Sequence, residues 1–125
     1  FSFDFWGIQR DVERVCALFR NEGMMDRHKI TIFALVGFGE GMEKDIARVK
    51  RIAELGAYPF VMRYVPLDSL KKRPPAKGWD TAQITQFSRY YNMPKIWTTG
   101  VDLERWLRGI RPGNVPKEQI ALEVD

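Results

Sequence analysis

The sequence predicts an α/β domain in which parallel strands alternate with helices. Two apolar stretches, 29–39 and 58–65, have the length and the content of β-branched and aromatic residues that are typical of strands. The first of them is nearly continuously apolar, as strands of parallel sheets are when both faces are covered. Helical patterns precede and follow it, so the order is strand, helix, strand, helix, strand. Because such crossovers are right-handed, the three strands should share one parallel sheet.

The first half of the chain supplies these elements in order. Residues 1–5 alternate aromatic and polar side chains and predict a short strand. Apolar residues recur at helical spacing from about 8 to 21, and Gly23 is suited to end that helix. Cys16 belongs to the apolar stripe, so we interpret it as a small buried group rather than a reactive thiol. A second helix is predicted over 42–55, and its inward residues are Ile46, Val49, Ile52 and Ala53.

The second half predicts a loop followed by helices. Residues 67–80 are polar and rich in proline and lysine, so they form the expected surface loop. A helix is predicted over 81–91 with Asp80 as its N-cap, and a shorter one over 101–107. The predicted organisation is one domain with a βαβαβ unit (1–66), a basic loop (67–80), a helical segment (81–110) and a tail (111–125). Three strands and three helices leave strand edges and apolar faces uncovered, which favours partner strands.

Composition narrows the classes of function. The chain has 125 residues, 45% of them hydrophobic, and a net charge of +4. Its single cysteine excludes an internal disulfide and a multi-cysteine metal site within this chain, and it favours a reducing compartment such as the cytoplasm. No apolar run approaches the roughly 20 residues that cross a bilayer, so no membrane partner is expected. Lys71, Lys72, Arg73 and Lys77 come closest to a basic patch, but no nucleic-acid-reading motif accompanies them, which favours a solvated loop.

Ligands of parallel α/β proteins bind beyond the carboxyl ends of the strands. The predicted ends lie at 4–7, 36–41 and 63–67. The second end contains the glycines of LVGFGEG, which allow the backbone to approach a ligand or a phosphate. A tight turn explains these glycines equally well. Glu40 either binds a ligand or complements the dipole of the following helix.

Two further charged residues lie at strand ends. Asp4 either caps the following helix or accepts a hydrogen bond from a ligand hydroxyl. Arg63 interrupts a run of bulky apolar residues, so we interpret it as a site residue. His28 is predicted to be a solvent-exposed loop residue. No Ser/His/Asp set, carboxylate pair or metal-ligand spacing is evident in the sequence, so no catalytic residue and no metal ligand is predicted.

These segments resemble a known family. FALVGFGE, residues 33–40, is similar to the fifth-strand motif G-x-I-x-G-x-x-E of radical S-adenosylmethionine (radical SAM) enzymes. Leu35 takes the isoleucine position, Gly37 the second glycine and Glu40 the glutamate, whereas Phe33 replaces the first glycine. FSFDFWG and ELGAYPFVMRYVPLD resemble the fourth and sixth strands of a subgroup of bacterial and phage iron–sulfur oxidoreductases. FSRYYNMPKIW resembles a tail of the same subgroup.

The resemblance implies the C-terminal half of a partial (β/α)6 TIM-like barrel that forms one wall of an S-adenosylmethionine pocket. It implies that Leu35 and Val36, next to the motif glycine Gly37, lie against the adenine and that Asp4 reaches the ribose or the amino-acid part. Because the carboxyl ends of parallel strands converge, Asp4, Glu40 and Arg63 should lie at the same mouth of the barrel and contribute to binding. In the family a CxxxCxxC motif after the first strand holds a [4Fe–4S] cluster. Because this chain has Cys16 alone, it is expected to be inactive by itself. Its open sheet edges are expected to pair with an N-terminal half of the same protein or with a second copy of the chain. The substrate is not predicted.

Two other functions stay open at this point. One is a non-catalytic nucleotide- or phosphate-binding module that uses the 37–41 turn and the basic loop. The other is an interaction module that completes its sheet with a partner.

Overall fold

The sheet of the protein is parallel and has two full strands. The computed structural model describes residues 1–27, 30–66, 78–98 and 100–111. Strand β1 (Thr31–Val36) pairs with β2 (Tyr58–Arg63), and the register places Thr31 opposite Tyr58 and Val36 opposite Arg63. The predicted mixed α/β class and the parallel pairing are therefore confirmed.

The expected first strand, residues 1–5, is reduced to a single bridge between Ser2 and Phe33. Phe33 donates its N–H to the carbonyl of Phe1 (3.0 Å), and its carbonyl accepts the N–H of Phe3 (2.8 Å). The backbone pairing ends at Asp4, because the N–H of Leu35 is bound by the side chain of Asp4 and not by a backbone carbonyl: Oδ1 accepts it at 2.9 Å. The N-terminal segment thus lies parallel to β1 without forming a full strand.

Helices connect and cover these strands. They are η1 (Trp6–Ile8), α1 (Gln9–Asn21), α2 (Met24–Arg27), α3 (Met42–Glu54), α4 (Thr81–Asn92), α5 (Pro94–Trp97) and α6 (Leu103–Leu107). The three longest match the predicted helices to within a few residues, and Asp80 caps α4 as predicted by accepting the N–H groups of Ala82 and Gln83. Helices η1, α2 and α5 were not predicted from the sequence.

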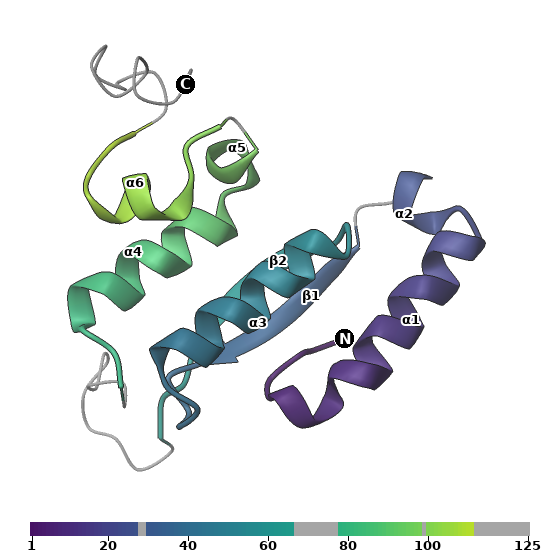
Figure 1. The fold of residues 1–125 in the computed structure, drawn as a ribbon, viewed down its shortest axis with the longest axis horizontal. Coiled ribbons are helices and arrows are strands. Elements are labelled where there is room, and N and C mark those ends of the chain that lie inside the picture. The colour runs from purple at the N-terminus through teal and green to yellow at the C-terminus, as the bar shows by residue number, and fades with distance from the viewer. Residues whose placement is uncertain (28–29, 67–77, 99, 112–125) are drawn as a thin grey trace.

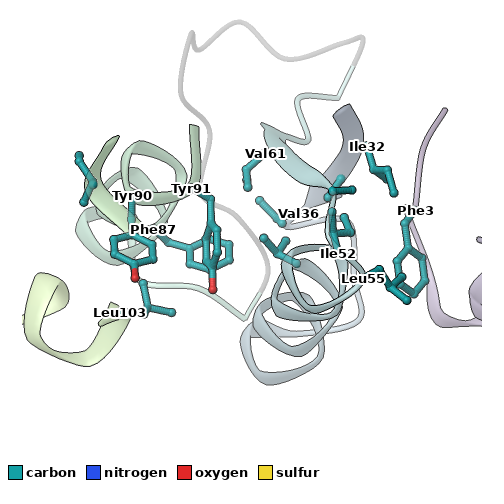
Figure 2. Packing of buried hydrophobic residues seen from close by; sticks show 14 of the residues in the cluster. Phe3, Ile32, Val36, Ile52, Leu55, Val61, Phe87, Tyr90, Tyr91 and Leu103 are labelled. Atoms are coloured by element: carbon teal, nitrogen blue, oxygen red, sulfur yellow. The ribbon is translucent and has the colours of Figure 1, made fainter. Parts of the chain in front are cut away.

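The core lies on one face of the sheet. Figure 1 shows α3 lying across β1 and β2, between α1 and α4. In Figure 2, Val36 and Val61 of the strands and Ile52 of α3 meet in this layer, whereas Phe87, Tyr90 and Tyr91 of α4 pack beside it.

The other face of the sheet is open in the part of the chain that the structure describes. Ile32, Ala34 and Val36 of β1 are fully buried, but Phe33 is 40% exposed, and its neighbours on β2, Phe60 and Met62, are 43% and 40% exposed. The apolar run predicted a strand covered on both faces, and this was wrong for the described residues. The outward side chains of the two strands form an exposed apolar face instead. In it the rings of Phe33 and Phe60 pack edge to face, with their centroids 5.5 Å apart.

The two edges of the sheet differ. Asn92 at the end of α4 closes the outer edge of β2, because its Oδ1 accepts the N–H of Val61 (2.6 Å) and its Nδ2 donates to the carbonyl of Val61 (2.9 Å). Pro59 has no N–H to offer at the same edge. At the opposite edge, the backbone of Ser2 points away from β1 and has no hydrogen bond among the described residues. A partner strand could therefore pair beside Ser2 more readily than beside Val61.

Candidate functional site

The site predicted from the sequence lies at the carboxyl edge of the parallel sheet. Strand β1 ends at Val36, and the turn from Gly37 to Gly41 leads into α3. The φ angles of Gly37 and Gly41 are +81° and +93°, a region that side-chain-bearing residues rarely adopt. A Cβ atom at Gly39 would meet no atom within 4 Å, so the space beside the turn is open.

The predicted site residues divide between the two faces of the sheet. Leu35 stands opposite Met62 on the open face, beside the carboxylate of Asp4 that accepts its N–H. Val36 is fully buried in the core, so only its backbone is available to a ligand. Arg63, its register partner, lies on the helix side and lines a cleft of about 290 Å³ between β2 and α4, together with Thr85 and Ser88. The structure therefore brings Asp4 and Leu35 together, binds the N–H of Gly37 to Asp45 of α3, and places Arg63 on the opposite face from Leu35.

Glu40 points toward α3. Its Oε1 lies 3.5 Å from Nε of Arg48, and its Oε2 lies 3.5 Å from the backbone N–H of Trp6. Oε1 is buried and makes an ion pair with Arg48 rather than a hydrogen bond, and the side chain as a whole is 26% exposed. Glu40 is thus held toward α3 by Arg48, and part of its side chain stays exposed at the edge of the sheet.

Two charged residues that the sequence analysis did not predict lie beneath the turn. Asp45 and Arg48 of α3 are each 1% exposed and form an ion pair, with Nη2 of Arg48 2.6 Å from Oδ1 of Asp45. Arg48 also donates to the carbonyls of Phe3 (2.5 Å) and Leu35 (2.8 Å). One guanidinium therefore links α3 to the N-terminal segment and to β1.

The carboxylate of Asp45 joins two further segments. Its Oδ2 accepts the N–H of Gly37 at 2.9 Å and the indole N–H of Trp79 at 2.8 Å. The burial of Asp45 and Arg48 could have been predicted from their spacing, since positions 45 and 48 fall on the same helical face as the buried Val49 and Ile52. Burying a charge on the inward face of a helix destabilises the fold unless the charge is paired. Such a charge in the sequence therefore indicates a buried polar network.

The remaining predicted features do not form a second centre. Cys16 is buried on α1, as predicted, and burial raises the pKa of its thiol above the ordinary value of 9.0. Among the described residues, no three side chains of the His, Cys, Asp and Glu types gather as metal ligands would. Those residues also form no helix of the length and apolarity that a bilayer requires. His28 and the basic residues 71–77 lie outside the described ranges.

Comparison with protein-family models, with curated proteins and with solved structures gives no match for this chain. The resemblance to radical SAM enzymes therefore rests on the residues of the sequence themselves, and the geometry of the carboxyl edge is the basis on which a function is proposed.

Proposed function

We propose that the chain forms one wall of an S-adenosylmethionine pocket, as the C-terminal half of a partial TIM-like barrel of the radical SAM type. The observation that carries this proposal is the carboxyl edge of the sheet, where Asp4 is hydrogen-bonded to Leu35 and β1 leads into an open glycine turn that contains Glu40. Parallel strands with helices on one face and an apolar opposite face are what a segment of barrel wall would present, with the apolar face toward the barrel interior.

The side chains at this edge suit the ligand. S-adenosylmethionine has an ammonium group and two ribose hydroxyls that donate hydrogen bonds, and the carboxylate of Glu40, whose side chain is 26% exposed, is a type of group that accepts them. Asp4 has a second carboxylate oxygen besides the one that binds Leu35. Leu35 itself offers an apolar contact to the adenine from the open face. The open space at Gly39 allows the ligand to approach the backbone.

Arg63 has a less direct role in this proposal. Because it lies on the helix side of β2, it would have to reach the ligand carboxylate around the end of the strand. Val36 would contribute its backbone only. The direct contacts are therefore assigned to Asp4, Leu35 and Glu40.

A four-iron cluster does not fit the residues of this chain. Such clusters are held by several thiolates. The chain has Cys16 alone, which is buried on α1 with a raised thiol pKa that disfavours the thiolate. We therefore assign no cluster chemistry to these residues and restrict the proposal to binding S-adenosylmethionine.

Calorimetry with S-adenosylmethionine tests the proposal on Glu40→Gln, with Glu43→Gln as the matched control. Both substitutions remove one negative charge near the start of α3, but Glu43 is exposed on the helix. Loss of a charge-assisted hydrogen bond should weaken binding roughly ten- to a hundredfold in Glu40→Gln, and Glu43→Gln should bind like the wild type. Equal affinity in the wild type and both variants would refute the pocket assignment.

A second candidate, an interaction module that completes its sheet with another strand, is favoured by the open face and by the backbone of Ser2, which makes no hydrogen bond to another described residue. In that case the partner is an N-terminal half of the same protein or a second copy of the chain. Phe60→Thr should then weaken association in light scattering, because it removes an exposed aromatic ring from the open face. A wild-type chain that stays monomeric at high concentration would exclude the second copy.

A further inference from the structure

We propose that Asp45 and Trp79 are positioning residues that hold the Gly37–Gly41 turn in its ligand-binding conformation, an inference that rests on the proposed function. The turn contains three glycines with positive φ angles. Such a segment has many accessible backbone conformations and needs contacts from outside to keep one of them. Two such contacts hold the turn, one at each end.

The contact at the start of the turn is made by Asp45. Its Oδ2 accepts the N–H of Gly37, the first residue after β1, at 2.9 Å. The same oxygen accepts the indole N–H of Trp79 at 2.8 Å, and the other oxygen is fixed by Arg48. Because the carboxylate is buried and bound by three donors, it can hold the Gly37 amide in one place.

The contact at the end of the turn is made by the residue before Trp79. A Cβ atom on Gly78 would lie 3.2 Å from Cα of Gly41, so the two glycine backbones are packed directly against each other. Gly78 has a φ of +79°, a conformation that suits glycine. The segment 78–79 therefore contacts both ends of the turn, through Gly41 directly and through Asp45 to Gly37.

Trp79 connects this contact to the helical layer. Its side chain is 9% exposed, and its ring packs against Phe87 of α4 at a centroid distance of 5.1 Å. The indole of Trp79 thereby connects α4, through its contact with Phe87, to the turn, through its hydrogen bond to Asp45. Trp79 does not reach the open face, so it acts on the ligand only through Asp45 and the turn.

The test compares Trp79→Phe with Trp97→Phe in the 125-residue chain. Both variants keep an aromatic ring and lose an indole hydrogen bond, but Trp97 donates to the carbonyl of Tyr91 (3.2 Å), remote from the turn. The first readout, taken without ligand, is amide hydrogen exchange at Gly37. We expect exchange roughly tenfold faster in Trp79→Phe and unchanged in Trp97→Phe, because the carboxylate loses one of the donors that fix it.

The second readout is affinity for S-adenosylmethionine, which should fall roughly tenfold in Trp79→Phe only. Unchanged Gly37 exchange in Trp79→Phe overturns the positioning role, whatever the affinities are. Faster exchange with unchanged affinity overturns its importance for the ligand. If exchange is faster but the wild type binds no S-adenosylmethionine, the positioning of the turn is supported and the proposed function fails. Gly78→Ala serves as a second variant, since its Cβ must displace Gly41 and should weaken binding by the same route.

Discussion

Replacing Arg48 by methionine should strongly destabilise the fold. The substitution keeps a long unbranched side chain but removes the donor to Phe3, to Leu35 and to Asp45. It leaves the carboxylate of Asp45, 1% exposed, without its counter-ion. Breaking a buried ion pair from one side costs about 3–5 kcal/mol. A domain of this kind has a total stability of about 5–15 kcal/mol, so the loss is a large part of the whole.

The assay is urea and thermal unfolding followed by circular dichroism. A loss of that size corresponds to a Tm lowered by roughly 12–20 °C for a chain of this length. Arg51→Met is the matched control, because Arg51 lies on the same helix and pairs with Glu13 and Glu54, yet is 36% exposed. An exposed pair contributes about 0–1 kcal/mol. Equal losses of stability in the two variants, or an Arg48→Met chain within about 1 kcal/mol of the wild type, would show that the buried ion pair does not hold the fold together.

Three further predictions concern the sheet edge, the buried phenol and iron. Asn92→Ala removes both hydrogen bonds to Val61 and should lower the free energy of unfolding by about 1–3 kcal/mol. It should also open the β2 edge, so that light scattering detects concentration-dependent association. A variant as stable and as monomeric as the wild type would contradict this. Burial raises the pKa of Tyr91 from its ordinary value of 10.0, so the folded state holds the phenol proton more tightly and stability should fall as pH rises above about 10. Tyr91→Phe should remove this part of the fall in pH-dependent urea unfolding, and an identical fall in both proteins would disprove the assignment. Reconstitution of the chain with iron and sulfide should give no stable four-iron cluster, and stoichiometric cluster iron on the monomer would overturn that expectation.

The sequence predicted those features that depend on neighbouring residues. Apolar residues at helical spacing were sufficient to locate α1, α3 and α4, and the cap of α4 followed from Asp80. The parallel pairing of β1 with β2 followed from the helix between them. Both signals can be read from short stretches of sequence. The inward residues of a helix recur every three or four positions, and a single helix between two strands is enough to indicate that the strands are parallel.

Contacts between distant residues could not be predicted in the same way. Asn92 lies 31 residues from Val61, and Trp79 lies 34 residues from Asp45. The placement of Arg63 on the helix side depends on the strand register, because a shift by one residue exchanges the two faces. Asp45 and Arg48 were overlooked although their spacing was visible, because charged residues are expected at the surface unless a partner is known.

Chemical-shift mapping of S-adenosylmethionine on the 15N-labelled chain is the most direct test of the central claim. We expect saturable shifts that are largest for the amides of residues 35–41 and beside Asp4, and that are smaller in Glu40→Gln. The pocket is not at this edge if titration into the millimolar range produces no saturable shift, or if the shifts are confined to the cleft between β2 and α4 around Thr85 and Ser88.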